Sequence, residues 1–114
     1  MQRSEIARLL ALSGDVRIDF IASEALKNNP MGDPSERPLV VYLPPEYDPQ
    51  GSRRYPSLYV LHGYTGDVAA LISARPWETN VLQWADRLVR ERRMPPAFVV
   101  LVDGFTRLGG SQYV

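Results

Sequence analysis

The sequence predicts an α/β fold with a partly parallel sheet, and three observations carry this prediction. Residues 57–61 and residues 97–102 are apolar without alternation, as expected for strands that are buried on both faces. Between them, residues 80–93 show the i, i+3, i+4, i+7 spacing of an amphipathic helix. A strand, a helix and a strand at this spacing form a βαβ crossover, which is expected to be right-handed with parallel strands.

The composition of the chain excludes several classes of function. The 114 residues are enough for one modest domain, and the 13 basic and 13 acidic residues balance to zero net charge. The sequence therefore has no basic footprint for nucleic acid or for an anionic membrane, and we expect neither as a partner. No cysteine is present, which excludes disulfides, thiolate metal sites and cysteine nucleophiles. The single histidine is poor evidence for a metal ligand, and phosphate-binding glycine motifs are absent, so we expect no metal and no cofactor.

The chain is expected to begin with a helical segment, residues 1–14, ahead of a domain that occupies residues 15–114. Ser4 is the candidate N-cap of this helix and Gly14 its candidate end. Three apolar residues are expected to share one helix face: Ile6, Leu9 and Leu10. The apolar run is too short for a membrane span, and Arg8 interrupts it where a signal peptide needs an unbroken core. A cytoplasmic location is therefore expected.

Two further strands are expected before the crossover. Val16, Ile18 and Phe20 alternate with polar residues, which predicts a half-buried strand. Residues 38–43 form the second predicted strand, and the prolines that follow end it.

The crossover helix has its own start and stop signals. Thr79 or Asn80 can cap its start, and arginines crowd its C-terminus, where cations favour the helix dipole. Its predicted apolar stripe places Trp84 in the core and consists of Val81, Trp84, Ala85 and Leu88.

Three segments together resemble a known family. They read RPLVVYLPPEY at residues 37–47, RYPSLYVLHGYTGD at residues 54–67 and PAFVVLVDG at residues 96–104. As a set they resemble the esterase branch of the α/β-hydrolase superfamily that includes esterase D-like, feruloyl esterase-like and enterochelin esterase-like enzymes. The resemblance covers about residues 15 to 114, which is nearly the whole sequence.

The resemblance implies an order of strands. The first strands would form an antiparallel edge, and residues 97–102 would insert between residues 39–43 and residues 57–61. Strand 57–61 would then keep one side unpaired, where family members place the strand that carries the nucleophile. We therefore expect this sequence to be the N-terminal part of an α/β-hydrolase domain, with the C-terminal part of the same domain as its partner.

The turn after strand 57–61 is the candidate catalytic feature, and it reads His62-Gly63-Tyr64-Thr65-Gly66. In α/β-hydrolases one oxyanion donor comes from the turn at this position. The resemblance implies Tyr64 N–H as the first candidate donor and Thr65 N–H as the second, with Gly63 forming the turn. The alternative is that the two glycines only permit a tight connection.

The single histidine, His62, is not expected to be the general base, because the catalytic histidine of the superfamily follows the nucleophile in the chain. We expect it to hydrogen-bond the neighbouring loops and to fix the oxyanion turn. Asp103 follows a buried strand and is interpreted as a turn-capping residue.

Ser111 is not expected to be the nucleophile. Its surroundings, Gly109-Gly-Ser-Gln-Tyr113, place a tyrosine where a nucleophile elbow needs glycine, and no strand leads into the serine. Arg107, Ser111 and Tyr113 are candidates for lining the substrate site, and a solvated loop is the alternative. Trp77 is a candidate for the acyl or alcohol pocket.

The resemblance implies a serine-dependent carboxylic ester hydrolase that acts on a small-molecule ester. By resemblance, the nucleophile, acid and base of such an enzyme would lie further along the chain, so the 114 residues alone are expected to be inactive. The alternative is an inactive hydrolase remnant that acts as a binding or interaction piece through its unpaired strand.

Overall fold

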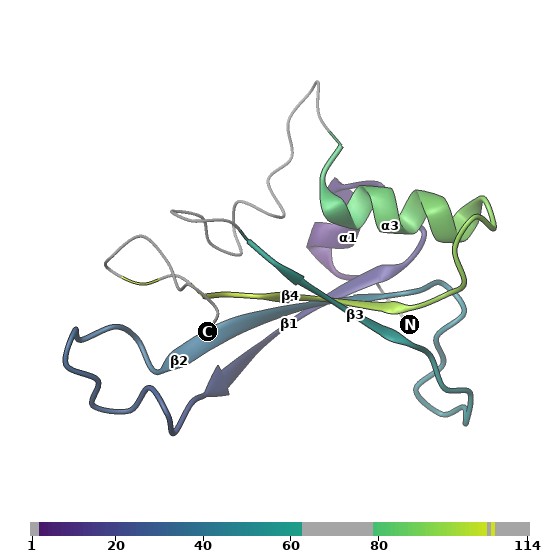
Figure 1. Ribbon diagram of the computed structural model, residues 1–114. Helices are drawn as coiled ribbons and strands as arrows, with labels where there is room; N and C mark the ends of the chain where they lie inside the picture. Colours follow the sequence, from purple (N-terminus) through teal and green to yellow (C-terminus); the bar gives the residue numbers. More distant parts are fainter. Residues whose placement is uncertain (1–2, 63–78, 105, 107–114) are drawn as a thin grey trace.

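The computed structural model describes residues 3–62, 79–104 and 106. Within these ranges one four-stranded sheet carries two helices on the same face, which confirms the predicted α/β class (Figure 1). The helices are α1 (Glu5–Leu9) and α3 (Val81–Arg90). The strands are β1 (Asp15–Ala22), β2 (Glu36–Leu43), β3 (Ser57–Leu61) and β4 (Phe98–Val102). Neither helix is long and apolar enough to cross a lipid bilayer.

The strand order is β1-β2-β4-β3, as the resemblance implied. Strand β2 pairs in antiparallel fashion with both β1 and β4, whereas β3 and β4 run parallel, from Ser57 opposite Phe98 to Leu61 opposite Val102. The parallel βαβ unit is thereby confirmed. In the described sheet β3 is the last strand, so one of its edges pairs with no other strand of this sheet.

The core lies between the sheet and the two helices. Side chains that share the helix-covered face of the sheet include Tyr42, Val99 and Leu101, all fully buried. The core cluster consists of Ala7, Leu10, Leu12, Val16, Val40, Tyr42, Leu82, Ala85, Val99 and Leu101. Because the cluster draws on both helices and three of the strands, burial of its apolar surface holds the layers together.

The buried face of α3 differs from the predicted stripe. Leu82, Ala85 and Val89 point into the core, while Trp84 is 47% exposed and its ring lies 5.6 Å from the Arg87 guanidinium carbon. The predicted stripe was wrong by one residue because Asp86, a carboxylate, lies on the buried face and hides the apolar periodicity. The start of the helix is as expected: Asn80 forms a capping box with Gln83.

The N-terminal helix is shorter than predicted. Ser4 caps it, accepting a hydrogen bond from Ala7 N–H, but the helix ends at Leu9 and not at Gly14. Of the three residues expected on one face, Leu10 is buried and Ile6 packs against the core, whereas Leu9 is 77% exposed. Ala7, which was not expected there, is fully buried. The helix ends early because the chain turns at residue 11, where φ is 55°, and this turn directs the following residues onto the sheet.

Two predicted strands are less buried than their sequences suggest. In β1 only Val16 is buried, while Ile18 and Phe20 on the same face are exposed, because neither described helix reaches that end of the strand. Strand β3 was expected to be buried on both faces, but Tyr59 is 65% and Leu61 50% exposed. Within the described residues, β3 has a neighbouring strand on one side only.

Candidate functional site

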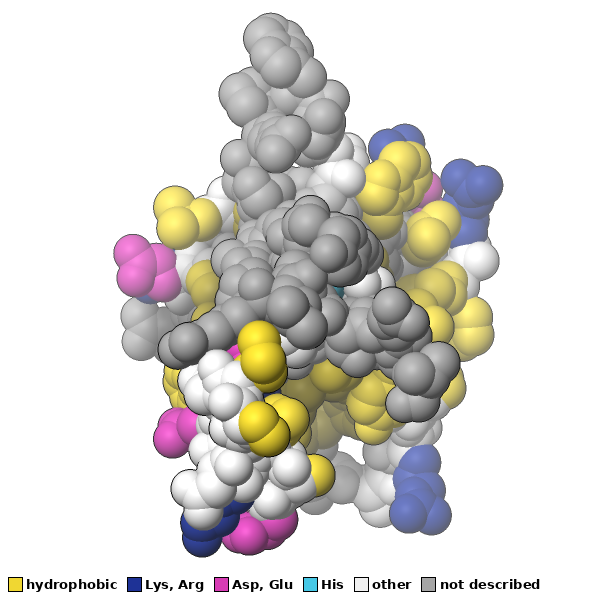
Figure 2. All heavy atoms as spheres, turned by 60° about the vertical axis from the view of Figure 1, so that its left-hand side comes forward, with side chains coloured by type: hydrophobic (Ala, Val, Ile, Leu, Met, Phe, Trp, Pro, Cys, Tyr) yellow, Lys and Arg dark blue, Asp and Glu magenta, His cyan; other side chains and the backbone are white. Residues whose placement is uncertain are grey.

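The candidate site is the edge of the sheet where the parallel strands β3 and β4 end. Leu61 lies opposite Val102, so His62 and Asp103 leave the sheet side by side. Ligands of open α/β sheets bind outside the carboxyl ends of parallel strands, which makes this edge the place to look for chemistry. Figure 2 turns this end of the molecule forward and shows hydrophobic side chains on both sides of it.

His62 is buried at this edge and is bonded to the end of the neighbouring strand. The side chain belongs to a residue that is 4% exposed, and its Nε2 accepts a hydrogen bond from Gly104 N–H at 2.8 Å. A main-chain amide can only donate, so Nε2 carries no proton and the neutral ring holds its hydrogen on Nδ1. The expectation that His62 hydrogen-bonds a neighbouring loop is confirmed, and the bonded Nε2 is not available as a general base.

Asp103 completes this small cluster. Its Oδ1 lies 3.6 Å from His62 Nε2, and its side chain is 13% exposed. Because that nitrogen already accepts from Gly104, the two side chains form an ion pair only when the imidazole is protonated. Two groups therefore lie near Nε2: Gly104 N–H, which donates to it, and the Asp103 carboxylate, which could only accept from it.

The residues that were expected to touch the ester lie outside the described ranges and remain predictions: Gly63, Tyr64, Thr65, Trp77, Arg107, Ser111 and Tyr113. What the structure describes is the residue that precedes the predicted oxyanion turn, His62, and the residue to which it is bonded, Gly104. In the described part of the chain, no group of three or more His, Cys, Asp or Glu residues is arranged to hold a metal ion.

A second buried polar cluster was not foreseen from the sequence. The carboxylate of Asp86, a residue that is 2% exposed, accepts hydrogen bonds from three groups. Ser13 N–H donates to Oδ2 at 2.9 Å, Gly14 N–H donates to Oδ1 at 2.9 Å, and Tyr42 O–H donates to Oδ1 at 2.8 Å. Arg90 Nη1 lies 3.6 Å from Oδ2 and balances the charge from the exposed side of α3. A signal for this role was present, because an aspartate among the apolar positions of a helix needs buried partners.

The Asp86 cluster is structural. It joins α3, β2 and the segment between α1 and β1. Burial raises the pKa of the Tyr42 hydroxyl far above its usual value, and the hydrogen bond to Asp86 adds to this. Gly14 is part of the same contact, since a Cβ at this position would lie 2.3 Å from the Leu43 carbonyl oxygen.

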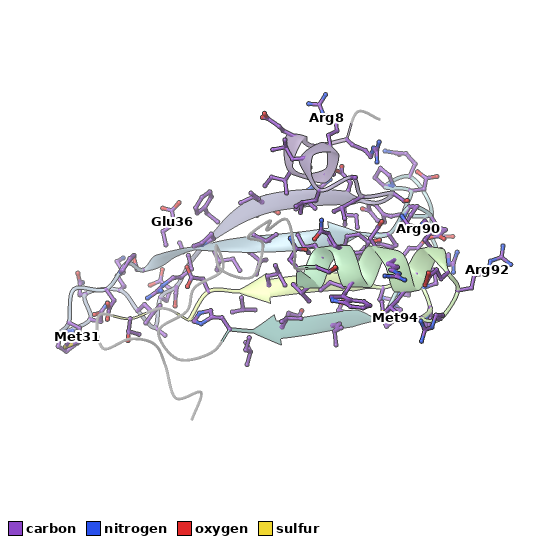
Figure 3. The ribbon with its side chains drawn as sticks, turned by 90° about the horizontal axis from the view of Figure 1, so that it is seen from above. Arg8, Met31, Glu36, Arg90, Arg92 and Met94 are labelled. Carbon is purple, nitrogen blue, oxygen red and sulfur yellow. The ribbon has the colours of Figure 1, made fainter. Side chains whose placement is uncertain are left out.

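A cavity of about 340 Å³ lies beside this second cluster. Gly14, Asp15, Leu43, Pro44 and Tyr47 are among the residues that line it. It opens where β2 ends, and β2 is antiparallel to β4, so the cavity lies towards the opposite end of the sheet from His62. In Figure 3, the C-terminal end of α3 with Arg90 and Arg92 lies at that far end, away from Met31.

The sheet order and the position of the cluster at the ends of β3 and β4 define an α/β-hydrolase-like fold. The sequence profile of the family described as "Putative esterase" matches residues 32–107, which is more than half of the 114 residues. The chain belongs to this family. Among curated proteins, no relative matches the sequence significantly.

Solved structures agree with the fold. A ferulic acid esterase is 25% identical over 82% of this chain, with a TM-score of 0.54. A serine-to-alanine mutant of the feruloyl esterase module from Clostridium thermocellum, complexed with sinapinate, is 19% identical over 96% of this chain, with a TM-score of 0.62. A ferulic acid esterase from Anaeromyces mucronatus in complex with ferulic acid is 22% identical over 89%, with a TM-score of 0.60. The chain covers 31%, 31% and 32% of these structures.

Proposed function

We propose that this chain is part of a serine-dependent carboxylic ester hydrolase and that it supplies the oxyanion-hole turn. The observation that carries the proposal is the position of His62 at the C-terminal edge of the sheet. Its hydrogen bond to Gly104 fixes the residue that immediately precedes Gly63. Membership of the esterase family supplies the reaction class.

The turn would act through its main chain. When a serine attacks an ester carbonyl, negative charge develops on the carbonyl oxygen, and pre-placed N–H groups stabilise it. Tyr64 N–H is the proposed donor, Thr65 N–H is the second candidate, and Gly63 lets the main chain approach the ester. The nucleophile, the acid and the base would come from the C-terminal part of the same domain, which we propose as the partner of this chain.

The substrate class would be a small-molecule ester, with Trp77, Ser111 and Tyr113 near its acyl or alcohol group. Three of the similar solved structures are named as feruloyl or ferulic acid esterases, which makes an aromatic acyl ester a suitable probe. Two probes are suitable: methyl ferulate, which has a bulky aromatic acyl group, and p-nitrophenyl acetate, which has a small acyl group and an activated leaving group.

The test measures hydrolysis of both esters by the complete natural polypeptide. We expect turnover that a serine-directed fluorophosphonate abolishes by covalent labelling of one serine. If the polypeptide hydrolyses neither ester, or if it keeps full activity after labelling, the proposal is contradicted. As a control, the 114 residues alone should give no turnover above buffer. If they are active and Ser111→Ala removes that activity, Ser111 is the nucleophile and our interpretation of it is wrong.

One observation favours a second candidate, an inactive remnant that binds a partner strand. Strand β3 exposes Leu58, Tyr59 and Leu61 and offers one unpaired edge within the described sheet. Such an edge can add a strand from another segment. If the complete polypeptide hydrolyses neither ester but associates with a partner, and Tyr59→Lys weakens that association, this second function is correct.

A further inference from the structure

The hydrogen bond between His62 and Gly104 joins two strands at the edge where the ester would bind. It links residues 42 positions apart in the sequence, at the ends of the parallel pair β3 and β4. The imidazole is buried, so water does not compete for Nε2. A buried main-chain N–H that loses its acceptor is costly, which gives this single contact a strong influence on the local main chain.

We propose that His62 is a positioning residue of the ester-hydrolase site and that it acts in one tautomer, with Nε2 as acceptor and the hydrogen on Nδ1. This inference rests on the proposed function and goes further than the expectation from the sequence, because it names Gly104 N–H as the partner and requires one tautomer of a side chain that performs no chemistry on the ester. In this role the ring holds the start of the turn after β3 at a fixed distance from the start of the loop after β4.

The tautomer matters because two partners compete for the same nitrogen. Gly104 N–H can only donate to Nε2, whereas the Asp103 carboxylate, 3.6 Å away, can only accept from it. If the hydrogen moved to Nε2, the ring would donate to the Asp103 carboxylate, and the Gly104 N–H would lose its acceptor. The observed distance of 2.8 Å to Gly104 N selects the first arrangement.

The consequence concerns the position of the main chain. The proposed oxyanion donors, Tyr64 and Thr65, follow His62 by two and three residues. Donor groups stabilise a transition state only when they are held in place before the reaction, and a displacement of about 1 Å can lower the rate about 100-fold. A ring that anchors the preceding residue therefore affects kcat more than KM.

The experiment compares three variants of the complete natural polypeptide. In His62→Gln, the amide oxygen can take the place of Nε2 as acceptor for Gly104. His62→Asn carries the same amide on a shorter side chain that does not reach, so it is the matched control. His62→Phe keeps a ring and removes the acceptor. Two quantities are measured: hydrogen exchange of the Gly104 amide, and kcat and KM for p-nitrophenyl acetate.

We expect Gly104 to exchange at least about tenfold faster in the Asn and Phe variants than in the wild type, and within about threefold of the wild type in the Gln variant. The same two variants should lose at least about tenfold in kcat with KM nearly unchanged, and Gln should restore most of it. Unchanged exchange in the Asn and Phe variants would overturn the inference. So would a Gly104 amide that exchanges in the wild type as fast as an unbonded amide, which needs no variant to fold.

The exchange measurement does not depend on catalysis, so failure of the positioning role of His62 can be distinguished from failure of the proposed esterase function. If the wild type hydrolyses no ester while the Gly104 amide still responds to the variants, the hydrogen bond stands and the esterase proposal fails. If the wild type is active but the Gln variant behaves like the Asn variant in both measurements, the positioning role is wrong and the esterase proposal stands.

Discussion

Two buried polar side chains lie towards opposite ends of the same sheet and have different surroundings. Asp86 accepts hydrogen bonds from Ser13, Gly14 and Tyr42, so one carboxylate holds three segments of the chain. His62 accepts from Gly104, at the edge where the predicted oxyanion turn begins. Both residues are almost inaccessible to solvent. Burial alone therefore does not distinguish a structural residue from a candidate functional one, whereas the position relative to the strand ends does.

Substitutions in the two places should therefore have different effects, on stability in one case and on rate in the other. Changes in the Asp86 cluster should lower the free energy of unfolding and leave the turnover of each folded molecule unchanged. Changes at His62 should alter the rate through the geometry of the site. Three variants of the Asp86 cluster test the effect on stability, and the variants of His62 test the effect on rate.

The largest effect is expected for Asp86→Ala. Without the carboxylate, two main-chain N–H groups and the Tyr42 hydroxyl lose their buried acceptor, which should lower the free energy of unfolding by about 3–5 kcal/mol. Urea unfolding of the complete polypeptide measures this. Asp19→Ala is the matched control, because Asp19 is an exposed aspartate on β1. Equal stability of the two variants would show that the Asp86 cluster does not hold the fold.

A smaller effect is expected for Gly14→Ala. The added Cβ would lie 2.3 Å from the Leu43 carbonyl oxygen and 2.8 Å from the Tyr42 ring, so the main chain must shift. We expect a loss of about 1–3 kcal/mol in unfolding free energy. Gly51→Ala adds the same methyl group where the nearest atom is 3.4 Å away, and it should change stability by less than about 0.5 kcal/mol. If the folded Gly14 variant has a reduced kcat, the expectation that this end of the sheet affects only stability is wrong.

The smallest effect is expected for Tyr42→Phe, which removes one hydrogen bond to Asp86 and should cost about 1–2 kcal/mol at neutral pH. Its pH dependence is more informative. Burial, and then Asp86, raise the pKa of Tyr42 in the folded state above the unfolded value of about 10. The stability from the neutral phenol is complete below pH about 10 and is lost as the pH rises above it. The stability difference between wild type and variant should therefore shrink above pH 10, and a constant difference would contradict this.

The fold could be predicted largely from the sequence, because each strand carries a local signal. Apolar runs at residues 57–61 and 97–102 with a helix between them predicted the parallel pair, and the resemblance placed β4 between β2 and β3. Exposure could not be predicted in the same way. Ile18 and Phe20 have the pattern of buried residues, yet their burial depends on whether a helix covers that end of the sheet.

The site was predictable in outline. The single histidine was correctly assigned a bonding role, since its place after β3 excludes the order of a catalytic triad. Its partner Gly104 and its tautomer could not be read from the sequence, because they depend on how far apart two strand ends lie. Asp86 was missed for a related reason: its partners Ser13 and Gly14 lie more than 70 positions away along the chain.

That separation has a consequence for how the molecule forms. The β1–β2 pair is local and can form as soon as residue 43 is available. The bonds from Ser13 and Gly14 to Asp86 span 73 and 72 positions, so the segment between α1 and β1 cannot reach its final packing until α3 has been synthesised. Closing so long a loop carries an entropic penalty before the contacts compensate for it. During synthesis, α1 and the segment that follows it must therefore wait for α3 before they reach their final packing, although the neighbouring β1–β2 pair can form earlier.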